Sequence, residues 1–278
     1  MGESASSRMG RDSTQGTKFD LHCWRHSVKI WVDRQLVESS SEFLDDKNWP
    51  LGTGLFETMR TENGSVQFLT RHMRRVSASA RVLKISVPDE DLISQAIDEL
   101  LIAAPHPVGR LRLSFSSERF VATHESYTAD SNPFKVMVSQ ELSSTVGRQY
   151  KVFPYSGRLG LLQEATAAGC DELIQVDNND RVCEGAVSNY AFRIQGQWRT
   201  PPITAGILPG VIRAVAVEKC GVVVKDLSRR EASSCEAAIV MSSLKIALPV
   251  ASIDGRSLAI DSDVSDICSK LRQLATAH

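Results

Sequence analysis

The chain has 278 residues, of which 42% are hydrophobic and 23% charged, and its formal net charge is −1. A chain of this length and composition can bury a large core and form two domains of ordinary size. The charge excludes the strongly basic character of a nucleic-acid-binding protein, and no stretch holds the roughly 18 continuous apolar residues of a membrane span.

Residues 1–25 are polar and rich in serine and glycine, and they lack the apolar core of a signal peptide, which predicts a disordered extension. The six cysteines are scattered without a C-x-x-C pair. Scatter of this kind is typical of reduced thiols in the cytoplasm and predicts no metal site.

An α/β domain is expected over residues 26–140. Residues 28–37 alternate as a strand with a turn in its middle, and residues 55–61 and 65–69 are expected to pair as a hairpin across Glu62-Asn63-Gly64.

Two helices are expected next in this half, at 71–83 and at 89–103, the second between two prolines. Strands at 110–116 and 134–140 are expected to close it. The polar segment 116–133 is long for a connection, and such loops often cover a site.

Residues 141–149 crowd Ser, Thr and Gly together and are expected to form a linker to a second domain, 150–278. Helices are expected there at 161–168, at 211–220 and, from the capping-box spacing of Ser228 and Glu231, at 228–235.

The most informative pattern in the second half starts at Lys151, which is followed by an Ala-rich helical run, a strand, a turn and Glu184. The two residues are 33 positions apart (184 minus 151). The turn formers Asn178-Asn179-Asp180 place Glu184 on the second strand of a hairpin. Alone, each residue is more simply interpreted as a surface charge. Their order can bring an amine and a carboxylate to one pocket, as an aldehyde cofactor with a ring nitrogen requires.

This pattern resembles the fold-type IV pyridoxal-phosphate (PLP) enzymes, which include branched-chain and D-amino-acid aminotransferases and 4-amino-4-deoxychorismate lyases. The motifs that carry the resemblance are Lys151, Gly169-Cys170-Asp171-Glu172, Asp177 to Glu184-Gly185, and Asn189. The resemblance implies a two-domain α/β (α+β) fold with a smaller N-terminal domain and a larger C-terminal domain that holds a barrel-like sheet. It makes Lys151 the Schiff-base lysine, Glu184 the partner of the pyridine nitrogen and Asn189 a further cofactor-binding residue.

Further segments resemble the phosphate side of these enzymes. Residues 54–60, GLFETMR, and 72–76, HMRRV, match the family's "G-x-F-E-T" and "H-x-x-R-L". Arg75 is then the arginine whose planar fork binds the cofactor phosphate. Without the flanking motif, a helix-surface charge beside Arg71 and Arg74 would be the preferred interpretation.

The run LPGVIR at 208–213 resembles the family's "L-P-G-I-T-R", where a helix N-terminus meets the phosphate. Backbone N–H groups of Val211 and Ile212 would serve there, although Ile212 replaces a threonine and removes one hydroxyl contact. Ser242 or Ser243 would add a hydroxyl from the last loop, unless that loop is a plain turn at a strand end.

The substrate side rests on three residues. Arg110 and Arg112 alternate onto one face of their strand, and the resemblance gives Arg112 the substrate carboxylate; two solvent-facing arginines are an equal alternative. Thr58 stands where the lyases have a threonine, so its hydroxyl could relay a proton, or it is simply a good strand former.

Small differences then favour one branch of the family. The "R-x-H" motif of D-amino-acid aminotransferases is absent after Arg112, and 152–155, VFPY, replaces the "G-G-N-Y" of branched-chain enzymes. The "N-R-L" of the lyases is missing too, but the spacing from Ser242-Ser243-Leu244 to Pro249-Val250 resembles their last loop.

The resemblance therefore implies a 4-amino-4-deoxychorismate lyase of folate biosynthesis, which releases pyruvate and 4-aminobenzoate. A class IV aminotransferase acting on branched-chain or D-amino acids is the alternative, and a catalytically inactive PLP-binding relative stays open. The same resemblance implies a cytoplasmic homodimer that acts on a small-molecule amino substrate, without a nucleic-acid or membrane partner.

Overall fold

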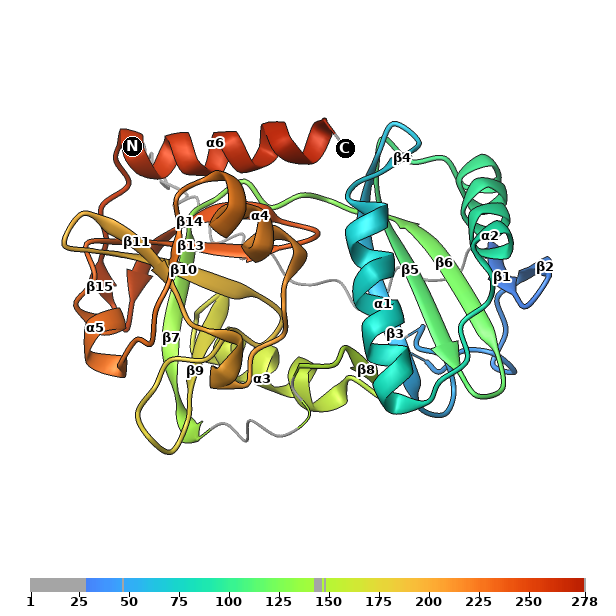
Figure 1. Cartoon of the computed structure of the whole chain (residues 1–278), viewed down its shortest axis with the longest axis horizontal. Helices are drawn as coiled ribbons and strands as arrows, with labels where there is room; N and C mark the ends of the chain where they lie inside the picture. The colour runs from blue at the N-terminus through green and yellow to red at the C-terminus, as the bar shows by residue number, and fades with distance from the viewer. Residues whose placement is uncertain (1–28, 47, 143–146, 148, 278) are drawn as a thin grey trace, which may run out of the picture.

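The computed structural model describes residues 29–46, 48–142, 147 and 149–277. The extension predicted at 1–25 lies outside the described residues. Two β-sheets with helices packed on them form two halves that stand side by side (Figure 1). This arrangement confirms the expected two-domain α/β fold.

The N-terminal half is built on an antiparallel sheet in which the described residues form seven strands, in the order β2-β1-β6-β5-β3-β4 with β8 also paired to β3. The strands are β1 (Lys29–Val32), β2 (Gln35–Glu38), β3 (Gly54–Glu62), β4 (Ser65–Val66), β5 (Val108–Ser116), β6 (Phe120–Ser126) and β8 (Val152–Phe153). Helices α1 (Leu69–Leu83) and α2 (Glu90–Ala103) cover one face of this sheet, over a core that includes Trp31, Met59 and Leu111.

The segment 116–133 is not the loop that the sequence predicts, because residues 120–126 form β6 between β1 and β5. Two polar side chains of β6, His124 and Glu125, are buried with partners. The His124 ring contacts the Thr61 hydroxyl at 2.8 Å, and Glu125 forms an ion pair with Arg110. Because buried polar residues of this kind interrupt the alternation of apolar and polar residues, the sequence pattern does not predict the strand.

The C-terminal half holds a curled sheet in which the described residues form eight strands, in the order β12-β11-β10-β13-β14-β7-β9 with β15 paired to β14. The strands are β7 (Phe134–Leu142), β9 (Glu172–Val176), β10 (Asn189–Ile194), β11 (Gln197–Thr200), β12 (Val223–Val224), β13 (Ala237–Ser242), β14 (Ile246–Ile253) and β15 (Arg256–Ser257). The helical elements are α3 (Ser156–Ala167), a 3₁₀ turn (Ile203–Ala205), α4 (Val211–Lys219), α5 (Arg229–Ser233) and α6 (Ser262–Thr276).

Apolar residues pack on both faces of this sheet. Ala191 and Ile239 belong to the core beneath α4 and α6, whereas Tyr190 and Val240, their neighbours along the strands, belong to a second core on the opposite face. Burial on both faces explains the almost continuous apolar run of β13.

Strand β7 corrects a second expectation, because the sequence places 134–140 in the first half and the structure places it in the second sheet. There β7 runs parallel to β14 and β9, with Val136 and Val138 in the core. Strand propensity indicates that a segment pairs but not which sheet it joins. The expected domain bounds themselves stay a prediction.

Most of the remaining elements follow their predicted positions, and the capping box of Ser228 and Glu231 is confirmed at the start of α5. Helix α6 was not predicted. Its buried residues Val264, Ile267, Cys268, Leu271 and Ala275 recur at helical spacing, and Asp261 caps its N-terminus, so the signal was present in the sequence.

Candidate active site

Lys151 lies at the edge of the first sheet, directly before β8. Its carbonyl accepts a hydrogen bond from Phe56 N at 2.9 Å, and β8 pairs with Gly54 and Leu55. Only glycine fits at position 54, because a Cβ there would stand 2.1 Å from Phe115 O and 2.8 Å from the Phe153 ring. The close crossing of β8 thus fixes the backbone that carries the lysine.

The amine of Lys151 points at aromatic rings. Its Nζ stands 4.3 Å from the ring centroid of Phe56 and 5.1 Å from that of Tyr155. Burial lowers the pKa of Lys151 to about 7; Glu57 opposes the shift, while nearby arginines reinforce it. A large fraction of the amine is therefore neutral at neutral pH, the form that attacks an aldehyde.

Glu184 is buried, 2% exposed, beside the end of β9. The backbone pairs as the predicted hairpin requires, since Gln175 N donates to Glu184 O at 2.8 Å, although Glu184 is outside any regular strand. Its carboxylate accepts from Arg158 Nη2 at 2.6 Å on Oε1, and from Leu208 N at 2.9 Å and Asn189 Nδ2 at 3.1 Å on Oε2. These donors compensate the burial of its charge.

Arg75, on α1, reaches toward the second half of the molecule. Its Nε and Nη2 donate to the two oxygens of Glu57, each at 2.7 Å, and its Nη1 donates to Pro209 O at 3.0 Å. A guanidinium has five N–H groups, so two remain for an anion. Arg71 pairs with Glu218 and Arg74 is exposed, and both line the same pocket as Arg75.

Glu57 joins Arg75 to a buried histidine. His72 Nδ1 lies 2.7 Å from Glu57 Oε2, and His72 Nε2 lies 3.3 Å from Ser243 Oγ. Burial alone would raise the pKa of Glu57, but the charges and hydrogen bonds of Arg75 and His72 hold it well below its usual range. Burial lowers the pKa of His72 against the pull of Glu57, so Nε2 of the neutral ring can accept a hydrogen bond from the Ser243 hydroxyl.

The N-terminus of α4 faces α1 across the junction of the two halves (Figure 1). The first-turn N–H groups of Val211 and Ile212 have no acceptor within the helix. A Cβ at Gly210 would stand 1.9 Å from Asn189 Oδ1, so glycine is required for this approach. A pocket of about 470 Å³ opens here, lined by residues that include Arg75, Tyr150 and Val211.

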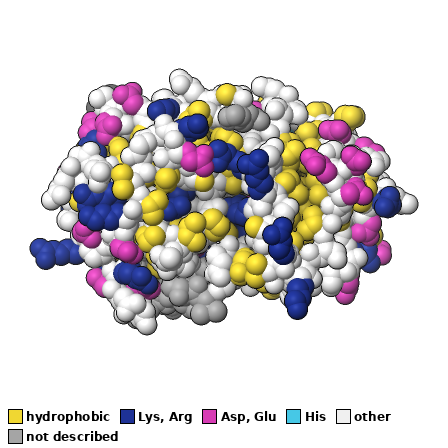
Figure 2. All heavy atoms as spheres, viewed as in Figure 1, with side chains coloured by type: hydrophobic (Ala, Val, Ile, Leu, Met, Phe, Trp, Pro, Cys, Tyr) yellow, Lys and Arg dark blue, Asp and Glu magenta, His cyan; other side chains and the backbone are white. Residues whose placement is uncertain are grey.

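The two serines of the last loop differ in their contacts. Ser242 Oγ accepts from Lys245 N at 3.2 Å and so belongs to the turn between β13 and β14. Ser243 is joined to His72 and lies on the side of the Arg75 network. On the face shown in Figure 2, basic and hydrophobic side chains meet between the two halves, and acidic side chains lie mostly toward the two ends.

Arg110, Arg112 and Thr58 share one face of the first sheet, with Thr58 directly opposite Arg112. Arg110 is engaged by Glu125. Arg112 is buried, stacks over Trp49 at 3.8 Å from its ring centroid, and donates to Asn48 O at 3.1 Å. Among the described residues, its buried Nε–H has no hydrogen-bond partner and is available to a ligand.

Several residues at this site were missed in the sequence. Glu57 and His72 stand inside the motifs that carry the resemblance, so their spacing could have identified them. Tyr155, whose pKa burial raises to about 12, follows Lys151 by four residues. No sequence signal indicated Arg158 or Trp49, because contacts distant in the chain bring them here.

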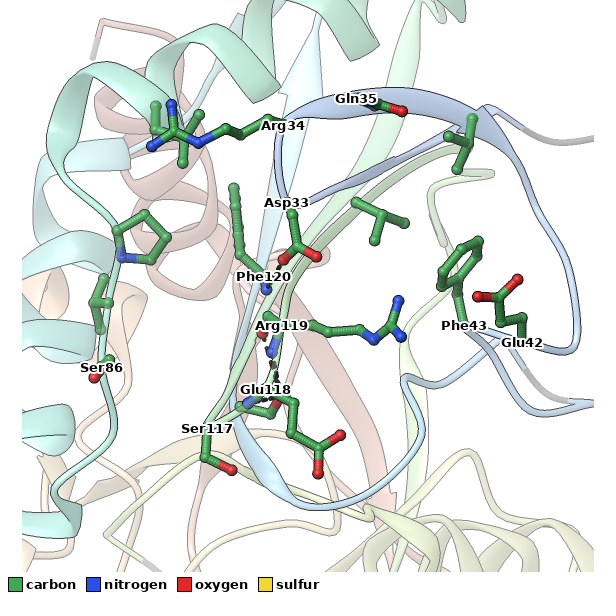
Figure 3. A pocket seen from close by; sticks show the side chains of 16 residues that line it. Asp33, Arg34, Gln35, Glu42, Phe43, Ser86, Ser117, Glu118, Arg119 and Phe120 are labelled. Carbon is green, nitrogen blue, oxygen red and sulfur yellow. Dashed lines mark hydrogen bonds between the residues drawn. The ribbon is translucent and has the colours of Figure 1, made fainter.

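A second, larger cleft of about 650 Å³ lies in the N-terminal half, at the turns of β1–β2 and β5–β6. Figure 3 shows Arg119 extended toward Phe43, and the Asp33 carboxylate accepting from Phe120 N at 3.0 Å. None of its described lining residues is a candidate site residue; the candidate residues lie toward the junction of the two halves.

The family model for class IV amino-transferases matches residues 54–253, and the chain belongs to this family. It is 25% identical over 171 residues to "Putative aminodeoxychorismate lyase" of Schizosaccharomyces pombe, covering 60% of this chain and 74% of that protein. It is 24% identical over 281 residues to "Putative branched-chain-amino-acid aminotransferase" of Methanocaldococcus jannaschii, covering 88% and 94%.

Among solved structures, the chain is similar to the PLP-bound form of a hypothetical aminotransferase from Mycobacterium tuberculosis. The TM-score is 0.77 at 19% identity, over 90% of this chain and 99% of that one, which shows a shared fold. The protein is thus an enzyme of the class IV PLP-dependent family, and its cofactor is PLP.

The residues at the junction fit that cofactor by their chemistry. They offer an amine of lowered pKa for the aldehyde, a buried carboxylate for the ring nitrogen, and an arginine with a helix N-terminus for the phosphate. Within the described residues there is no metal-binding cluster of His, Cys, Asp and Glu, and no helix is long and apolar enough to span a membrane.

Proposed function

We propose that the protein is a PLP-dependent 4-amino-4-deoxychorismate lyase, which releases pyruvate and 4-aminobenzoate. The observation that carries the proposal is the buried Arg112, which stacks on Trp49 and keeps an unused Nε–H. Trp49 also packs against Phe56 and Tyr155, with ring centroids 4.9 and 5.5 Å away, beside the amine of Lys151.

Flat aromatic faces next to one buried cation suit a ring that bears a carboxylate better than a small aliphatic side chain. Arg112 would bind the substrate carboxylate through its Nε–H and orient the ring toward Lys151. The similarity to the S. pombe protein supports the same assignment.

PLP, when bound, supplies an electron sink for charge that develops on the substrate carbon. The chain holds it at three points: Lys151 at the aldehyde, Glu184 at the ring nitrogen, and Arg75 with the N–H groups of Val211 and Ile212 at the phosphate. Asn189 holds Glu184 in place through Nδ2. Ser243 would meet the phosphate from the opposite loop by turning its single hydroxyl donor from His72 to a phosphate oxygen, and Ser242 would shape that loop.

Lys151 also performs the proton transfer. Its neutral amine would accept the proton from the amine-bearing carbon of the substrate. Thr58, opposite Arg112 on the sheet, would relay a proton between the amine and the substrate. Loss of pyruvate makes the ring aromatic, so the protein needs mainly to orient the substrate and hold these groups.

An aminotransferase is the second candidate, because the similarity to the M. jannaschii protein covers 88% of this chain, more than the similarity to the lyase. In that reaction Lys151 would move the proton between the substrate carbon and the cofactor carbon. In either case we infer a cytoplasmic homodimer, as the family resemblance implies. Analytical ultracentrifugation would measure the mass of this dimer.

The deciding experiment supplies the PLP-loaded protein with 4-amino-4-deoxychorismate and no 2-oxo acid. The expected result is stoichiometric pyruvate and 4-aminobenzoate, lost completely in Lys151→Ala together with the visible absorbance of bound cofactor. Arg112→Met is the matched variant: it should raise KM at least tenfold and leave that absorbance unchanged. Absence of pyruvate, with amino transfer from branched-chain or D-amino acids to a 2-oxo acid, would identify an aminotransferase instead.

A further inference from the structure

Arg158 forms an ion pair with Glu184. Neither the motifs nor the family match gives Arg158 a role. It is the third residue of α3, seven positions after Lys151. Its Nη2 donates to Glu184 Oε1 at 2.6 Å, and its Nη1 lies 3.3 and 3.4 Å from Gly185 O and Ala186 O. The side chain of Arg158 is 18% exposed and that of Glu184 is 3% exposed, so water screens the pair poorly.

The other cations near Glu184 are engaged elsewhere. Arg75 is held by both oxygens of Glu57, and Arg213 donates to Pro201 O at 2.6 Å and to the Thr200 hydroxyl at 3.2 Å. Among the described residues, the ionisable groups whose charges act on Glu184 or Arg158 include Lys151, Arg75 from α1, Arg213 from α4, Tyr155, and Glu172 from β9. Among the described residues, Arg158 is the cation that donates a hydrogen bond to the Glu184 carboxylate.

We propose that Arg158 is a positioning residue that, through Glu184, limits how tightly the ring nitrogen of bound PLP holds its proton. The inference rests on the proposed role of Glu184 as the partner of that nitrogen. A carboxylate stabilises a protonated ring nitrogen by its negative charge. A guanidinium 2.6 Å from one carboxylate oxygen offsets part of that charge, and in a buried site the effect is large.

A ring nitrogen that holds its proton less tightly withdraws less charge from the substrate. Such a moderated electron sink suits an elimination in which aromatisation supplies the driving force. Because Lys151 and Arg158 come from one short stretch of chain, the segment that carries the reacting amine also sets the charge of the cofactor ring.

The test uses protein loaded with PLP labelled with ¹⁵N at the ring nitrogen, whose chemical shift reports the proton directly. The shift is followed with pH in the wild type, Arg158→Gln, Arg158→Lys and the exposed control Arg81→Gln. The pH midpoint of the ring-nitrogen titration should rise by about one pH unit or more in Arg158→Gln. It should stay near the wild-type value in Arg158→Lys, which keeps the charge, and in Arg81→Gln.

Two outcomes overturn the proposal: equal midpoints in the wild type and Arg158→Gln, or a wild-type ring nitrogen that stays protonated until the protein unfolds. The second needs no variant, so the test survives if Arg158→Gln does not fold. Glu184→Gln separates this inference from the proposed site. If Glu184→Gln leaves the titration unchanged, the role of Glu184 itself fails; if only Arg158→Gln leaves it unchanged, this inference alone fails.

Discussion

The reactivity of Lys151 depends on its burial between aromatic rings. Burial lowers the pKa of its amine to about 7, against about 10.4 for a free lysine. Only the deprotonated amine attacks the aldehyde, so capture of PLP by the unloaded protein should accelerate as the pH rises from about 6 to about 8 and level off above that. Stopped-flow absorbance measures this rate.

If the capture rate instead rose with a pH midpoint near the pKa of a free lysine, burial would not lower the pKa of Lys151. Lys245 is a suitable control. It lies in the loop between β13 and β14, and Lys245→Met should leave the pH profile of capture unchanged.

At the scale of elements, the start of α4 depends on Gly210. A Cβ there would stand 1.9 Å from Asn189 Oδ1, and Asn189 in turn donates to Glu184. Gly210→Ala should therefore displace either the helix N-terminus or the carboxylate and weaken PLP binding at least tenfold, as measured by fluorescence titration. Gly157→Ala is the matched control, because open space surrounds a Cβ at that position and binding should not change.

At the scale of the molecule, the Glu57 network couples the two halves. Glu57 holds Arg75, which bonds Pro209 O, and His72, which contacts Ser243. Glu57→Gln leaves Arg75, whose side chain is only 10% exposed, without its counter-charge, so we expect a loss of about 3–5 kcal/mol in the free energy of unfolding at neutral pH, measured with urea. The variant Arg71→Met, which removes a more exposed ion pair with Glu218, should cost less than about 1 kcal/mol.

The sign of the pH dependence follows from the lowered pKa of Glu57 in the folded protein. Its contribution is fully present above the pKa of the unfolded carboxyl, about 4.3, and declines as the pH falls below that value. The stability difference between wild type and Glu57→Gln should therefore shrink in acid. A difference that is constant with pH would show that the charge of Glu57 does not stabilise the fold.

Much of the fold and of the cofactor side of the site was readable from local patterns. The helix at 90–103 has its cap, Asp89, and its periodicity within its own sequence, and the helix at 69–83 has its periodicity there. The turn residues of the hairpin that leads to Glu184 are local as well. The candidate residues Lys151, Glu184, Arg75 and Val211 stand in short motifs whose spacing is set by the chain itself.

The tertiary structure decided what local patterns cannot encode. Whether 134–142 joins the first or the second sheet depends on partners more than 30 residues away, Glu172 to Val176 and Val250 to Ile253. The polar strand 120–126 is a strand because Thr61 and Arg110 satisfy its buried side chains. Trp49 meets Arg112, and Arg158 meets Glu184, only once the chain has folded. The sequence by itself determined the family and the cofactor, because short motifs carry them; the environment of that cofactor arises from long-range contacts.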